Sequence, residues 1–189
     1  MDHADHVRLL RNGISASPPQ GLSPASEIGV WVDLGAGEGA FTLALADLLP
    51  TGSTIHAIDR DRGALSELDR AYARFAAKRD APRLETRVAD FTRDLDLRDV
   101  DGVVMANSLH FVHAKGPVLG RVRAMLKSGG RLLVVEYDTD RGNTWVPYPF
   151  SFETWRRLAP ENGFEEPALL ATHPSRFLGR IYSAAAIRD

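Results

Sequence analysis

The sequence has 189 residues, the usual size of one domain and too short for two full-sized ones. Hydrophobic residues make up 44% and charged residues 25%, a globular composition that excludes collagen-like and wholly disordered chains. The 23 Lys and Arg residues are balanced by 25 Asp and Glu residues. The resulting net charge of −2 gives no overall field that would hold a nucleic acid.

The residue types also exclude several kinds of site and location. There is no cysteine, which rules out disulfides, thiolate metal sites and a catalytic Cys. No apolar run approaches the roughly 20 residues that span a bilayer. Residues 1–5 lack the basic and then apolar order of a signal peptide. We therefore expect a cytoplasmic protein that does not associate with a membrane.

The N-terminal segment differs in composition from the rest. Val7, Leu9 and Leu10 predict a short helix over residues 3–12. Ser, Pro and Gly residues then interrupt regular structure between residues 15 and 24. We interpret residues 1–27 as a helix and tether that could serve as a lid, and residues 28–189 as the domain proper.

The remainder alternates β-branched runs with amphipathic segments, a pattern typical of a parallel sheet covered by helices on both faces. The last two predicted strands form a hairpin joined through residues 173–176, after a helix over 151–162. Ligands on such sheets bind where the strands end. The predicted strands cover residues 29–33, 54–58, 83–88, 101–106, 131–137, 167–172 and 178–187.

A glycine-rich turn, Leu34-Gly35-Ala36-Gly37-Glu38-Gly39, follows the first predicted strand. Glycine lets the backbone turn sharply and lets a ligand approach the next helix. With Ala40, the turn also satisfies the relaxed dinucleotide fingerprint, and Asp59 lies at the place of the ribose-binding acid. Spacing alone leaves two ligand classes open.

Charge favours one of these classes. Asp33 precedes the glycines and Glu38 lies among them, and both would repel a pyrophosphate. A ligand with a cationic ammonium and sulfonium suits this acidic strand end better. S-adenosylmethionine carries those charges, so we favour it over NAD(P).

The sequence resembles class I S-adenosylmethionine-dependent methyltransferases of the small-molecule type, over roughly residues 28–187. Residues 32–39 look like the first motif of that family, Asp59 like the second, residues 89–91 like the adenine-side motif, and residues 126–133 like the entry to strand five. The resemblance implies a Rossmann-like α/β three-layer sandwich with helices on both faces. Its seven-stranded, mostly parallel sheet would have the order 3-2-1-4-5-7-6 and end in an antiparallel hairpin.

The resemblance also implies a cofactor site for S-adenosylmethionine, with S-adenosylhomocysteine as product. Asp33 would contact the ammonium, directly or through water, and Asp59 would bind both ribose hydroxyls. As an alternative, Asp59 could cap the next helix, a role that Asp61 could fill instead. The methionine moiety would lie on the turn residues Gly35, Ala36, Gly37 and Gly39.

The adenine and methyl ends of the cofactor are assigned in the same way. Arg60 and Phe91 would flank the adenine, and Asp90 would accept a hydrogen bond from its amine. Asp90 and Phe91 could instead form only a turn and a core contact. Asn107 and Ser108 would lie beside the transferable methyl.

Methyl transfer needs alignment and exclusion of water more than a protein nucleophile. Where the acceptor must lose a proton, His110 is the candidate base, because it lies three residues beyond Asn107 and histidine is the side chain that most often acts as a general base. The alternative is that His110 only packs. His110 and His113 lack the further ligands of a metal site, so we expect no metal.

The acceptor side offers aromatic and cationic candidates. We predict that His110, Tyr137, Trp145, Tyr148 and Arg176 contact the acceptor, although the aromatic residues could be ordinary packing. The segment from Asn107 to His110 is not DPPY-like or NPPY-like, which argues against the amino-methylating nucleic-acid group. The Arg-rich stretch over residues 60–98 also holds many acids, which is typical of an ion-paired surface.

We therefore predict an S-adenosylmethionine-dependent methyltransferase that acts on a small-molecule acceptor by in-line displacement. We expect no nucleic-acid partner, and a monomer or homodimer. The alternatives are a cofactor-binding or interaction module without turnover and, less favoured, an NAD(P)-dependent oxidoreductase.

Overall fold

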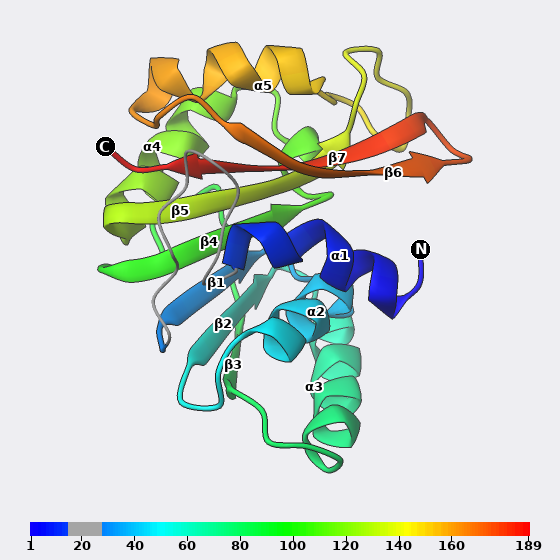
Figure 1. The fold of residues 1–189 in the computed structure, drawn as a ribbon, viewed down its shortest axis with the longest axis vertical. Coiled ribbons are helices and arrows are strands. Elements are labelled where there is room, and N and C mark those ends of the chain that lie inside the picture. Colours follow the sequence, from blue (N-terminus) through cyan, green and yellow to red (C-terminus); the bar gives the residue numbers. More distant parts are fainter. Residues whose placement is uncertain (15–27) are drawn as a thin grey trace.

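A computed structural model describes residues 1–14 and 28–189. Its centre is a seven-stranded sheet of order β3-β2-β1-β4-β5-β7-β6 (Figure 1). Strand β7 runs antiparallel to both β5 and β6, and the other pairs are parallel. The predicted order and the C-terminal hairpin are confirmed. The strands are β1 (Val30–Leu34), β2 (Thr54–Asp59), β3 (Arg83–Val88), β4 (Val100–Ala106), β5 (Leu126–Tyr137), β6 (Ala168–Ser175) and β7 (Gly179–Ile187).

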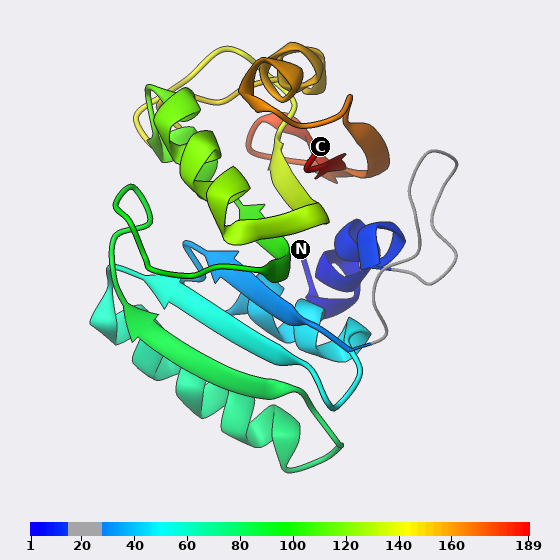
Figure 2. The ribbon, with the colours of Figure 1, turned by 90° about the vertical axis from the view of Figure 1, so that its left-hand side faces the viewer.

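Helices cover both faces of this sheet (Figure 2). Side chains of α1 (His3–Ile14), α2 (Ala40–Leu48) and α3 (Arg62–Ala76) share one apolar cluster with Trp31 and Val104 of the sheet. Side chains of α4 (Lys115–Met125) and α5 (Phe152–Leu158) share the other with Val32 and Val103. Neighbouring strand residues thus enter opposite cores, as the two-residue period of a strand requires. Across the described residues, no helix is long and apolar enough to cross a membrane.

Helix α1 is an integral part of the first core. Leu9 and Leu10 are fully buried, and Arg131 Nη1 donates to the carbonyl of Gly13 at 2.6 Å. The predicted tether, residues 15–27, lies outside the described residues, and a role as a lid stays a prediction.

Two predicted boundaries near the C-terminus are wrong. Strand β6 continues to Ser175, so the hairpin turn is residues 176–178 rather than 173–176. Pro174 is tolerated in β6 because this strand lies at the sheet edge, where one side of the backbone needs no partner. The helix predicted over 151–162 divides into α5 and the short 3₁₀ helix η2 (Pro160–Asn162), since Pro160 has no N–H to continue an α-helix.

Candidate functional site

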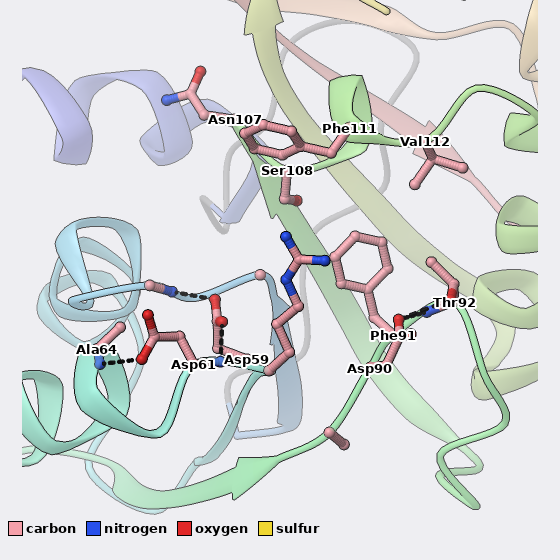
Figure 3. A pocket seen from close by; sticks show the side chains of 14 residues that line it. Asp59, Asp61, Ala64, Asp90, Phe91, Thr92, Asn107, Ser108, Phe111 and Val112 are labelled. Carbon is pink, nitrogen blue, oxygen red and sulfur yellow. Dashed lines mark hydrogen bonds between the residues drawn. The ribbon is translucent and has the colours of Figure 1, made fainter. Parts of the chain in front are cut away.

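A cavity of about 360 Å³ opens where β1, β2, β3 and β4 end (Figure 3). Parallel strands deliver the residues that follow them to this same edge of the sheet, which is the usual place for a ligand. The cavity is lined by Gly35, Gly37, Asp59, Arg60, Asp61, Ala64, Ala89, Asp90, Phe91, Thr92, Asn107, Ser108, Phe111 and Val112. Eight of the predicted cofactor residues are therefore brought together, and Asp33, Ala36 and Gly39 are not on the wall.

The glycine turn is packed against the end of β4. Gly35 has a φ of 81°, and a Cβ atom placed there would lie 2.5 Å from the Cβ of Ser108. Ser108 Oγ in turn donates to the carbonyl of Leu34 at 2.7 Å. By contrast, the space around Gly37, whose φ is 54°, is open. Gly35 is therefore required by local packing. At Gly37 the missing side chain leaves open space on the cavity wall.

Asp59 links the turn to the next helix. Its Oδ2 accepts from the amide of Gly37 and its Oδ1 from the amide of Asp61, both at 2.8 Å (Figure 3). The side chain of Asp61, not that of Asp59, caps α3 by accepting from Gly63 and Ala64. Asp59 is thus held on the cavity wall, and the helix cap that was the alternative role for Asp59 is provided by Asp61.

Four backbone amides of the turn are already occupied. Those of Gly35 and Ala36 donate to the carbonyl of Ile58 at 2.8 and 3.1 Å. The amide of Gly37 donates to Asp59, and that of Gly39 to the carbonyl of Ala36. A diphosphate binds to free amides at such a turn. These four are engaged within the chain, which disfavours the dinucleotide interpretation independently of charge.

Asp33 lies beneath the cavity rather than in it. Only 1% of the residue is exposed, and one carboxylate oxygen accepts from Thr42 Oγ1 at 2.6 Å. Burial is the main cause that raises the pKa of Asp33 to about 6; the Thr42 hydrogen bond opposes the rise and the charge of Asp59 adds to it. The acidic character predicted from Asp33 is therefore supplied on the wall by Asp59, Asp61 and Asp90.

Asp90 and Phe91 form the turn and the core contact that were one alternative for them, and they also lie on the cavity wall. Asp90 Oδ1 accepts from the amide and the hydroxyl of Thr92 at 2.9 and 2.7 Å, which makes a turn and keeps the pKa of Asp90 below its usual range. Asp90 and Phe91 also line the cavity, while Phe91 packs partly against the second core. A turn and a ligand contact are thus compatible.

Asn107 has two unusual features at the cavity edge. Its φ of 51° is in the left-handed region, which is uncommon for non-glycine residues and which asparagine adopts more readily than most of them. Its Oδ1 atom is buried and has no hydrogen-bond donor among the described residues. An unpaired buried acceptor beside a cavity is suited to a ligand that carries N–H or O–H groups.

The imidazole of His110 is held by a residue that the sequence reasoning missed. His110 is part of the 3₁₀ helix η1 (Leu109–Phe111), and its Nδ1 lies 2.7 Å from Glu136 Oε2. The amide of His110 also donates to Glu136 Oε1 at 3.1 Å. Because a carboxylate only accepts, Nδ1 is assigned the proton and Nε2 is left as the acceptor nitrogen. The sequence did contain a signal for this partner, because Glu136 is the one acidic residue of β5, the most apolar strand.

The structure separates the predicted acceptor residues. The rings of Tyr137 and His110 are 6.2 Å apart, and neither residue is among those that line the cavity. Trp145 and Tyr148 are exposed in the segment between β5 and α5, and Arg176 is exposed in the hairpin turn. In the part of the chain that the structure describes, no group of His, Asp and Glu is arranged to hold a metal.

Comparison with known proteins identifies the family. A family model described as "Methyltransferase domain" matches residues 32–132. The hybrid PKS-NRPS synthetase lepA of Aspergillus flavus is 34% identical over 110 residues, and tenellin synthetase of Beauveria bassiana is 33% identical over 110 residues. Each alignment covers 56% of this chain but only 3% and 2% of those proteins. The chain thus spans a very small part of the curated relatives it matches.

Solved structures share the fold at low sequence identity. An S-adenosylmethionine-dependent methyltransferase from Methanosarcina mazei has a TM-score of 0.68 at 18% identity, over 86% of this chain and 93% of that one. An arsenic(III) S-adenosylmethionine methyltransferase from Chlamydomonas reinhardtii has a TM-score of 0.70 at 20% identity, over 87% and 64%. The CurJ carbon methyltransferase has a TM-score of 0.67 at 22% identity, over 89% and 50%. The chain therefore belongs to the methyltransferase domain family and has the fold of S-adenosylmethionine-dependent methyltransferases.

Proposed function

We propose that this chain transfers a methyl group from S-adenosylmethionine to a small-molecule acceptor that loses a proton to His110. The observation that carries the proposal is the buried hydrogen bond between His110 and Glu136, because His110 directly precedes Phe111, which lines the cavity. Bound S-adenosylmethionine supplies a methyl group that its positively charged sulfur releases, keeping the bonding electron pair, to a nucleophilic atom.

The cavity residues suit that cofactor. Carboxylates of Asp59, Asp61 and Asp90 on the wall favour a ligand with two cationic centres. Asp59 already accepts one hydrogen bond at each oxygen and retains a lone pair on each for a ribose hydroxyl. The buried Oδ1 of Asn107 would accept from the ammonium, a role predicted from the sequence for Asp33.

The pair of His110 and Glu136 is arranged for proton abstraction. Glu136 orients the ring through Nδ1 and leaves Nε2 to take a proton. Glu136 is fully buried, so its negative charge is poorly screened and would stabilise the imidazolium that forms. A neutral amine or thioether acceptor would have no use for such a base, whereas a C–H or O–H acid would.

Among these acceptors we favour a carbon acid, a C–H flanked by carbonyl groups. The relatives support this choice, since one structural neighbour is described as a carbon methyltransferase and the curated relatives as PKS-NRPS and tenellin synthetases. Hydroxyl acceptors are the alternative, because the same base would serve them.

Calorimetry with S-adenosylhomocysteine and turnover of 2,4-pentanedione test the proposal together. The expected result is saturable binding and release of S-adenosylhomocysteine with 3-methyl-2,4-pentanedione as product, identified by mass spectrometry. Methylation at oxygen would support base assistance but overturn the choice of carbon. Binding without turnover on either C–H or O–H acids would overturn the enzymatic proposal in favour of a binding module. Absence of binding would overturn it altogether.

A further inference from the structure

Four rings form a continuous row along the edge of the sheet, which we call the aromatic row: Phe111, His110, Tyr137 and Phe177. The centroids of His110 and Phe111 are 4.3 Å apart, those of His110 and Tyr137 6.2 Å, and those of Tyr137 and Phe177 5.9 Å. The row combines residues of η1, the end of β5 and the hairpin turn between β6 and β7. It therefore exists only in the folded chain.

The aromatic row joins the cofactor cavity to the hairpin turn. Phe111 lines the cavity, and Figure 3 shows it with Ser108 on one side of that cavity and Asp59 on the other. Phe111 is 57% exposed and Phe177 50% exposed, although both are large apolar residues. The exposed aromatic surface thus lies at the two ends of the row, since His110 between them is only 3% exposed, and one of these ends is on the cavity wall. Exposed aromatic side chains beside a cavity are typical of a ligand-binding site.

The far end of the row is fixed in position. Tyr137 pairs with Ile181 across β5 and β7, and the amide of Arg180 donates to the carbonyl of Leu178 at 2.9 Å. Arg180 Nε also donates to Asp138 Oδ2 at 2.9 Å. These contacts lie directly beside Phe177, so the ring is presented by an anchored turn. A preorganised ring loses little conformational entropy when it binds a ligand.

We infer that the aromatic row binds a planar, conjugated acceptor, with its reactive atom at His110 and its distal part against Tyr137 and Phe177. This inference rests on the proposed function and narrows it to a substrate class. The rings meet at interplanar angles of 48°, 55° and 64°, so a flat molecule finds both faces and edges along the row. Offset and edge-to-face contacts favour another aromatic ring over a flexible aliphatic chain. Tyr137 and Phe177 are thus specificity-determining residues.

The test compares two acidic acceptors that differ in planarity, 1,3-dihydroxynaphthalene and 2,4-pentanedione. Binding of the naphthalenediol to protein saturated with S-adenosylhomocysteine is followed by its fluorescence. We expect Phe177→Ala to weaken this binding at least about fivefold, and Phe177→Trp to restore it. The matched control is Leu169→Ala, which removes an exposed apolar side chain of β6 that lies outside the row and should have no effect.

Turnover separates recognition from chemistry. In Phe177→Ala the KM for the naphthalenediol should rise above that of the wild type, while kcat for this acceptor stays within twofold. The KM for 2,4-pentanedione should also stay within twofold of the wild type. Equal affinity of the wild type and Phe177→Ala for the naphthalenediol, or no binding of it by the saturated wild type, would overturn the inference. If S-adenosylhomocysteine itself does not bind, the proposed function fails first. If the protein methylates 2,4-pentanedione but does not prefer the flat acceptor, the inference about the aromatic row is overturned while the proposed function stands.

Discussion

His110 Nδ1 and Glu136 Oε2 lie 2.7 Å apart, and the two side chains are 3% and 0% exposed. The chain also contains an exposed counterpart, in which His56 Nδ1 and Glu85 Oε2 lie 3.2 Å apart with 23% and 39% of the side chains exposed. The second pair is screened by water, and the first is not. This contrast supplies a matched control for the proposed base.

Replacing His110 by Ala should lower kcat by roughly 10²- to 10⁴-fold, because a general base contributes about that much. Glu136→Gln should lower kcat by a smaller factor, since the ring keeps a hydrogen-bond partner but loses the charge that stabilises its protonated form. Calorimetry should show affinity for S-adenosylhomocysteine within twofold of the wild type in both variants. His56→Ala and Glu85→Gln should leave kcat unchanged. An unaltered kcat in His110→Ala contradicts the assignment.

Asp59→Asn should weaken the binding of S-adenosylhomocysteine by roughly 10- to 100-fold, because hydrogen bonds to a charged group are worth about 1.5–3 kcal/mol. The loss combines the contacts to the ribose with a looser hold on the amide of Gly37. Calorimetry measures the change, and Asp94→Asn, an exposed acid outside the cavity, is the control. Equal affinities of wild type and Asp59→Asn would exclude Asp59 from the cofactor site.

Asp33 should make the protein less stable as the pH rises from about 4 to about 6. Its folded pKa of about 6 lies above the ordinary 3.8, so the folded state binds the proton more tightly in this window. The stability is therefore fully present below the ordinary pKa and is lost as the pH rises through the folded one. The loss is about 3 kcal/mol, from roughly two pKa units at 1.36 kcal/mol each.

Urea denaturation at pH 4, 5, 6 and 7.5 measures this effect as the difference between wild type and Asp33→Asn. The variant can still accept from Thr42 Oγ1 but has no charge to bury. Its free energy of unfolding should exceed that of the wild type increasingly toward pH 7.5. Parallel pH profiles for the two proteins would show that Asp33 does not titrate in this way.

Gly35→Ala should destabilise the protein more than Gly37→Ala. Both positions have positive φ, which costs a non-glycine residue about 1–2 kcal/mol. Only at residue 35 does the new Cβ also collide with Ser108, and such overpacking costs about 1–3 kcal/mol more. Thermal denaturation of the two variants under one condition gives the order of stability. Equal midpoints would argue against tight packing between the turn and β4.

Leu10→Ala should lower the free energy of unfolding by about 2–5 kcal/mol, the usual cost of a cavity at a fully buried leucine. The expectation follows from the place of α1 in the first core. Arg11→Ala, an exposed change in the same helix, is the control and should stay within about 0.5 kcal/mol. If Leu10→Ala unfolds at the same urea concentration as the wild type, α1 is not integral to the fold.

Local patterns were sufficient for much of the fold. The third strand was predicted over the same residues as β3, because apolar alternation and the flanking turn residues are local. Asp59 could be placed at the end of the sheet where ligands bind, because it comes at the end of a predicted parallel strand. The hairpin turn and the end of α5 were misplaced, since an edge strand tolerates Pro174 and a helix does not tolerate Pro160.

The sequence by itself determined the succession of strands and helices along the chain, the glycine turn and the acids beside it, because these features depend on residues that are neighbours in the chain. Only the tertiary structure decided which side chains meet. His110 and Glu136 are 26 residues apart and become partners because β4 and β5 pair in parallel register. Tyr137 and Phe177 meet because β7 returns antiparallel to β5. Contacts between strands arise from register, and no local pattern specifies it.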